Sequence, residues 1–171
     1  MTVDRGYVVR DARPDDSDAI RKLTLDAYAE YGNIMEPESW AGLSAAVRAA
    51  LASSDPMERI VADDDGTLIG SVLLYPASAR AYGDLSVEAS SPELRLLAVA
   101  REARGRGVGR ALVDECIRRV RQSGAMALGL HTSKSMATAM QLYERMGFER
   151  APELDFQPPG AEVVWGYRLG L

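Results

Sequence analysis

The stretch that decides the fold lies past the middle of the chain and reads Arg101-Glu102-Ala103-Arg104-Gly105-Arg106-Gly107-Val108-Gly109-Arg110. It follows a run at 94–99 that is apolar apart from Arg95, as in a strand near the middle of a sheet, and leads into a helical pattern over 107–122. Glycines at such a turn let the backbone bend sharply and bring its N–H groups close to a ligand. The first N–H groups of a helix lack partners inside it, so an anion is favoured in front of them. Four arginines and one glutamate give the stretch a local charge of +3. We therefore expect either an anion-binding turn or a tight turn with solvated arginines.

Two common phosphate-binding motifs do not fit this turn. The Walker A motif ends in Gly-Lys-Ser/Thr, whereas Gly109 is followed by Arg110 and Ala111. In the dinucleotide motif G-x-G-x-x-G, counted from Gly105, the third glycine would be residue 110, which is arginine. The sequence thus argues against both nucleotide-binding classes.

Strand and helix patterns alternate on both sides of the turn. Asp65-Gly66 separates two strand-like runs and is a strong hairpin signal. The long irregular segment 76–92 is of a kind that often carries function. We expect strands at 7–10, 59–62, 67–75, 94–99, 125–130 and 163–169, and helices from 19 to about 32 and at 37–53, 107–122 and 135–146. This order predicts an α/β domain with a mixed sheet and helices on its faces.

Composition excludes several classes of partner. The 20 Lys+Arg against 25 Asp+Glu leave a net charge of −5, which argues against a nucleic-acid-binding protein. The single cysteine, Cys116, and the single histidine, His131, cannot form a disulfide framework or a zinc site, so we expect no metal. The chain has no apolar run long enough to cross a membrane and no signal-peptide pattern, so we expect a cytoplasmic protein with no membrane partner.

Three local features together indicate a family. They are the motif R-x-x-G-x-G at Arg104, Gly107 and Gly109, the preceding strand 93–99, and the segment Leu142-Tyr143-Glu144-Arg145-Met146-Gly147-Phe148. In this order and spacing the chain resembles the GNAT (GCN5-related N-acetyltransferase) superfamily. The resemblance implies one domain over residues 1–171, with a mixed, mostly antiparallel sheet of six to seven strands flanked by helices on both faces.

The resemblance also implies acetyl-CoA as co-substrate. The main chain of Leu97, Ala98 and Val99 is then expected to pair with the pantetheine arm, as an added strand pairs with a sheet edge. The pyrophosphate is expected on the turn formed by Arg104, Gly105, Arg106, Gly107, Val108, Gly109 and Arg110.

Tyr143 stands where similar proteins carry the general acid, and Glu93 where some carry a carboxylate base. Strand alternation predicts that Glu93, Arg95, Leu97 and Val99 share one face. Structural roles are the alternatives: Tyr143 lies on an apolar helical stripe, and Glu93 could be an exposed carboxylate paired with Arg95. Many relatives use ordered water as the base.

The chain departs from the family pattern at two sites. Met136 stands where an asparagine is common, and Ala100-Arg101 replaces Asp-Pro. His131, at the end of a predicted strand, could approach the site, but it and Cys116 are both interpreted as structural.

The acceptor is expected to be a primary amine of a small molecule or protein, with a second copy of the chain as a candidate partner. A set of aromatic and acidic residues would suit a cationic amine: Tyr28, Tyr31, Glu36, Glu38, Trp40, Tyr82, Asp84 and Glu88. The alternative function is a non-catalytic acyl-CoA-binding or regulatory module.

Overall fold

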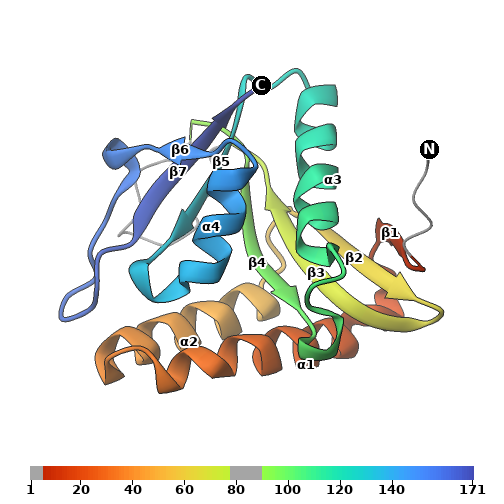
Figure 1. Cartoon of the computed structure of the whole chain (residues 1–171), viewed down its shortest axis with the longest axis horizontal. Helices are drawn as coiled ribbons and strands as arrows, with labels where there is room; N and C mark the ends of the chain where they lie inside the picture. The colour runs from red at the N-terminus through yellow and green to blue at the C-terminus, as the bar shows by residue number, and fades with distance from the viewer. Residues whose placement is uncertain (1–5, 78–89) are drawn as a thin grey trace.

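A central β-sheet organises the computed structural model, which describes residues 6–77 and 90–171 (Figure 1). Within these residues the sheet has seven strands in the order β1-β2-β3-β4-β5-β7-β6. β4 and β5 are parallel, and the other neighbours are antiparallel. The strands are β1 (Val8–Asp11), β2 (Glu58–Asp64), β3 (Thr67–Tyr75), β4 (Glu93–Val99), β5 (Ala127–Thr132), β6 (Glu149–Arg150) and β7 (Trp165–Gly170). The predicted mixed, mostly antiparallel sheet is confirmed.

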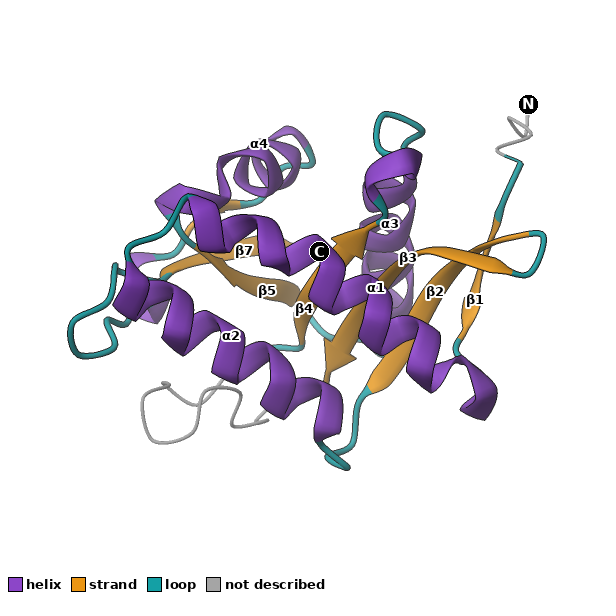
Figure 2. Cartoon of the chain, turned by 90° about the horizontal axis from the view of Figure 1, so that it is seen from below, coloured by secondary structure: helices purple, strands orange, loops and turns teal. Residues whose placement is uncertain are grey.

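Helices cover both faces of the sheet, as expected. They are α1 (Ser17–Ala29), α2 (Pro37–Ala52), α3 (Val108–Gln122) and α4 (Ala137–Arg145). Neighbouring residues of β3 show which face each helix covers, because side chains alternate along a strand. The Ser71 hydroxyl lies 3.4 Å from that of Thr24 in α1, whereas a Cβ at Gly70 would meet Val108 of α3 at 2.7 Å. α1 and α3 therefore pack on opposite faces. Figure 2 shows α2 beside α1, and α4 on the side of α3.

The Asp65-Gly66 turn forms the hairpin between β2 and β3. Both residues have positive φ, 49° and 90°. Positive φ at the two central residues is the geometry that matches the twist of paired strands. Asp63 Oδ1 accepts a hydrogen bond of 2.7 Å from the Gly66 amide and closes the turn. The hairpin prediction is confirmed.

A β-bulge in β4 overturns the expected alternation. β3 pairs with β4 as Leu73↔Arg95 and then as Ser71↔Ala98, so Val72 alone faces two residues, Leu96 and Leu97. Leu96 takes a φ of 49°, which a branched side chain rarely adopts. The extra residue sends Leu97 to the face opposite that of Arg95. The prediction that Glu93, Arg95, Leu97 and Val99 share one face is therefore wrong.

The helix predicted at 135–146 is divided in two. A short 3-10 turn, Lys134–Met136, precedes α4.

Among the helices in the described part of the chain, none is long and apolar enough to cross a bilayer.

Candidate functional site

The glycine-rich stretch forms a turn that leads directly into α3. Gly105 and Gly107 have φ of 80° and 78°, the left-handed conformation that glycine adopts without steric cost. Gly107 is the N-cap of α3, and no side chain caps this helix end. Helix geometry leaves the amides of Val108, Gly109 and Arg110 without intrahelical partners. This end of α3 has the geometry of an anion-binding site.

The arginines of this turn are paired with carboxylates from elsewhere in the chain. Glu30, just after α1, accepts hydrogen bonds from Arg101 at 2.8 and 3.1 Å and from Arg104 at 2.8 and 3.3 Å. These contacts lower the pKa of the Glu30 carboxyl, with the Arg104 hydrogen bond as the largest cause. The other two pairs are Arg106 with Asp64 at 2.9 Å and Arg110 with Asp114 at 3.8 Å.

These pairs change the charge expected at the turn. Glu30, Asp64 and Asp114 add three negative charges around the +3 stretch, so the local sum is zero. The charge of +3 counted from the sequence holds for the stretch itself, but folding places three carboxylates beside its arginines. An anionic ligand would contact the backbone amides directly. To contact the arginines, it would have to displace these carboxylates.

Gly109 marks the place where β4, α3 and α4 converge. A Cβ there would meet Leu142 of α4 at 3.4 Å, Val99 of β4 at 3.6 Å and Leu97 of β4 at 4.0 Å. The structure therefore brings the candidate strand segment, the turn and the Leu142–Phe148 segment together. Met136, seven residues before Tyr143, lies just ahead of α4.

β4 and β5 pair at one end and then separate. Their ladder in the described chain contains the register pair Glu93↔Gly129, supported by a hydrogen bond of 2.8 Å from the Gly129 amide to the Pro92 carbonyl. Figure 2 shows the two strands diverging at an angle. Beyond Glu93, the β5-facing edge of β4 takes no part in that ladder. The segment Leu97–Val99 belongs to this edge.

Tyr143 lies in the core between α4 and the sheet. The residue is 6% exposed, and its ring centroid lies 5.8 Å from that of Phe148 in an edge-on arrangement. It belongs to the main hydrophobic cluster, which is the position expected if its role is structural. The role of general acid stays a prediction.

Glu93 is buried, which excludes the exposed carboxylate considered above. Its Oε2 lies 3.6 Å from an Arg95 guanidinium nitrogen and 3.5 Å from His131 Nδ1. The pairing with Arg95 was anticipated, but the contact with His131 was not. Glu93 and His131 lie on parallel strands joined through a long connection, and no local sequence pattern gives the register of such a pair.

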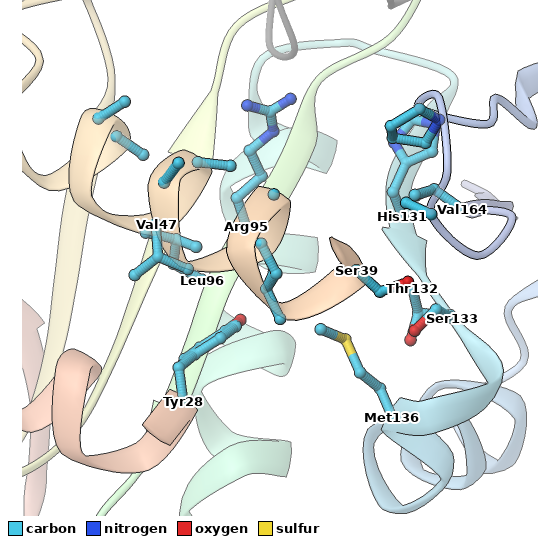
Figure 3. Close-up of a pocket in the computed structure, with 18 of the residues that line it drawn as sticks. Tyr28, Ser39, Val47, Arg95, Leu96, His131, Thr132, Ser133, Met136 and Val164 are labelled. Atoms are coloured by element: carbon cyan, nitrogen blue, oxygen red, sulfur yellow. The ribbon is translucent and has the colours of Figure 1, made fainter. Parts of the chain in front are cut away.

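A cavity of about 790 Å³ lies between α2 and the diverging strands. Figure 3 shows Arg95 and Leu96 of β4, and His131 and Thr132 of β5, in its wall. Thr132 Oγ1 is buried and has no hydrogen-bond partner within the residues that the structure describes. The α2 wall is built largely of small apolar side chains: Ala45, Ala46, Val47, Ala49, Ala50 and Ala52.

The expected acceptor residues fall into three groups. Tyr28 lines the cavity. Four of them are not among the described residues that line it: Tyr31, Glu36, Glu38 and Trp40. Tyr82, Asp84 and Glu88 lie outside the described residues. Two carboxylates outside this set line the cavity, those of Asp55 and Glu162. Glu162 accepts hydrogen bonds from Ser133 at 3.0 Å and Ser135 at 3.1 Å.

Comparison with known proteins agrees with this geometry. Residues 18–148 match the model of the acetyltransferase (GNAT) family. The chain belongs to this family. It is 32% identical over 162 residues to a mycothiol acetyltransferase of Cellulomonas flavigena, covering 91% of this chain and 44% of that protein. The chain thus spans about half the length of the curated relatives it matches.

Solved structures of GNAT proteins share the fold over almost the whole chain. A GCN5-related N-acetyltransferase from Kribbella flavida has a TM-score of 0.66 and 25% identity, covering 99% of this chain and 100% of its own. A PaiA N-acetyltransferase from Thermoplasma acidophilum, solved in complex with coenzyme A, has a TM-score of 0.64 and 16% identity. It covers 94% of this chain and 97% of its own.

Proposed function

We propose that the chain is an N-acetyltransferase domain that transfers the acetyl group of acetyl-CoA to a primary amine of a small molecule or peptide. One observation carries the proposal. β4 loses its β5 neighbour after Glu93, and its other end meets the uncapped start of α3. A ligand with an extended amide-containing arm and a polyphosphate head fits both features together. Family membership supports acetyl-CoA as that ligand.

In this proposal the pyrophosphate contacts the amides of the turn 104–110, and the pantetheine arm pairs with Leu97–Val99. Six residues separate Val99 from Glu93, which is about 20 Å of strand. An arm that runs back along β4 carries its thioester toward Glu93, where the strands begin to separate. The cavity beside Arg95 and His131 is then the entry for the amine.

The reaction needs a base, an acid and direct attack in a ternary complex. Glu93 removes a proton from the acceptor ammonium, and the freed nitrogen electron pair attacks the acetyl carbonyl carbon. The C–S bond breaks, and Tyr143 protonates the leaving thiolate. Reference pKa values of about 10 for tyrosine and about 8.5 for a thiol make that last transfer uphill by about 2 kcal/mol.

The decisive experiment incubates the protein with acetyl-CoA and a panel of primary amines, then follows thiol release together with mass spectrometry of each amine. Acetylated amine and equimolar free CoA are expected. Binding of acetyl-CoA with no acetylated product across the panel would instead support a non-catalytic acyl-CoA-binding module.

Tyr143→Phe tests the acid. Turnover is expected to fall by about 100-fold, at the low end of general acid catalysis, with acetyl-CoA affinity retained. Tyr167→Phe is the matched control, because it also removes a buried tyrosine hydroxyl, one bonded to Glu144 at 3.0 Å. Tyr167→Phe is expected to keep wild-type turnover. Unchanged turnover in Tyr143→Phe would remove Tyr143 as the acid.

A further inference from the structure

The proton chemistry of His131 is constrained by its two ring nitrogens. Nε2 lies 2.9 Å from the Leu154 carbonyl oxygen, and Nδ1 lies 3.5 Å from Glu93 Oε2. A carbonyl oxygen can only accept a hydrogen bond, so Nε2 must carry a proton. Nδ1 is therefore the nitrogen at which His131 gains or loses one.

Nδ1 and Glu93 Oε2 make a favourable contact only with a proton between them. An ionised carboxylate is an acceptor, and an unprotonated Nδ1 is an acceptor as well. The contact becomes attractive when Nδ1 donates to the carboxylate or when a protonated Glu93 donates to Nδ1. Both side chains are almost fully buried, at 6% exposure for His131 and 5% for Glu93, so water does little to weaken this preference.

Neighbouring groups contact both side chains of the pair. Arg95 of β4 lies 3.6 Å from the same Glu93 oxygen, and its guanidinium lies 4.6 Å from the Tyr75 ring centroid. Asp155 also interacts electrostatically with His131. The pKa of Asp155 is lowered mainly by its hydrogen bond from Arg150. The Phe156 ring packs edge-on against His131 at 5.4 Å.

The pair also stands at the right place for the proposed reaction. His131 lines the cavity, and Glu93 occupies the last β4–β5 pair before the strands separate. We propose that Glu93 and His131 form one carboxylate–imidazole base, in which His131 is a positioning residue that holds Glu93 and shares its proton. This inference rests on the proposed function and deepens its base step.

The proton balance is simple. The form of the pair that acts as the base has no proton between its two groups. An N–H bond of the acceptor ammonium breaks, and its proton moves to the pair, where Glu93 Oε2 and His131 Nδ1 share it. The electron pair stays on the amine nitrogen, which attacks the acetyl carbonyl. After product leaves, the shared proton passes to solvent and the pair is restored.

The first test reads the pair without any acceptor. Because the chain has a single histidine, the imidazole signals in a nitrogen-15 NMR spectrum of the labelled protein need no assignment. At neutral pH we expect protonated Nε2 in the wild type and a lower degree of Nδ1 protonation in Glu93→Gln. An unprotonated Nε2, or an Nδ1 signal that Glu93→Gln leaves unchanged, would overturn the pair.

The second test uses two amide variants in the amine assay. His131→Gln keeps a donor near the Nε2 position and so retains the bond to Leu154, while His131→Asn places an amide near Nδ1 beside Glu93. Neither can accept a proton. We expect kcat to fall by about 100-fold or more in both, with acetyl-CoA affinity retained.

The two variants separate a catalytic from a structural role. If His131 only braced the fold, His131→Gln would restore kcat because it keeps the Leu154 contact, and that result would overturn the proposal. A wild-type protein that acetylates no amine would overturn the proposed function, and the role of the pair with it. An active enzyme with undiminished kcat in His131→Gln overturns the pair alone.

Discussion

Glu30→Gln tests whether the carboxylate just after α1 competes with the cofactor for the arginines of the turn. Glu30 accepts four hydrogen bonds from Arg101 and Arg104. In the proposed complex, a polyphosphate on the turn would draw on the same guanidinium groups, so the Glu30 contacts would weaken when it binds. Replacing the carboxylate by an amide removes the competitor while keeping the size of the side chain. We therefore expect Glu30→Gln to bind acetyl-CoA more tightly than wild type.

The structure sets the size of the effect. The side chains of Arg101, Arg104 and Glu30 are 75%, 45% and 33% exposed, so both ion pairs are largely solvated. Exposed pairs contribute about 0.2–1 kcal/mol each. Two such pairs, partly lost on binding, amount to about 1 kcal/mol, which corresponds to about a fivefold decrease in Kd. The gain should shrink from about 0.1 M to about 1 M salt, as the Debye length falls from about 10 to about 3 Å.

Isothermal titration calorimetry with acetyl-CoA at both salt concentrations measures this change. Asp26→Asn is the matched control, because Asp26 lies one helical turn before Glu30 and pairs with Lys22 rather than with the turn. It removes the same charge from α1 and is expected to leave Kd near wild type. A Kd for Glu30→Gln that is unchanged or weaker at low salt would refute the competition. An equal gain in Asp26→Asn would show a long-range charge effect instead.

Three further substitutions or measurements test the packing described above. In Gly107→Ala the new Cβ would have no atom within 4 Å, but the residue would have to keep a φ of 78°. We expect this strain to lower the free energy of unfolding by about 1–2 kcal/mol, with a lower melting temperature and weaker acetyl-CoA binding. An unchanged melting temperature would contradict this. Cys116 is fully buried, which raises its pKa to about 12, so a thiol reagent at pH 8 should label it only after denaturation; labelling of the native protein would show an open core. In Gly166→Ala the new Cβ would overlap Leu154 and lie 2.9 Å from the Ala151 carbonyl oxygen. We expect chemical unfolding to show a destabilisation of about 1–3 kcal/mol. Gly170→Ala, whose Cβ would have no atom within 4 Å, is the control and is expected to show none.

The parts of the fold that sequence predicted are those encoded by neighbouring residues. Asp65-Gly66 supplies the positive φ values of its hairpin, and the glycines at 105 and 107 supply those of the turn before α3. The apolar spacing of α3 matches its buried face, which includes Leu112 and Cys116. In each case the local chain carries both the conformation and the reason for it.

The features that sequence did not predict depend on distant partners or on a single inserted residue. Glu30 is 71 residues from Arg101, so the neutralised turn could not be recognised from the +3 stretch alone. The contact of His131 with Glu93 depends on a parallel register that only the folded sheet defines. The bulge at Leu96 leaves the run 94–99 as apolar as a regular strand would be, so no change in pattern marks it.

That bulge explains how one short strand can serve two faces. Without the extra residue, Leu97 and Val99 would point with Arg95 into the cavity, and Leu96 and Ala98 would point to α3. With it, Arg95 and Leu96 line the cavity, while Leu97 and Val99 pack near Gly109 at the start of α3. The left-handed conformation of Leu96 is then the local cost of this arrangement. In the proposed enzyme, it keeps Arg95 with the base Glu93 on one side of β4 and lets the other side anchor the cofactor-binding turn.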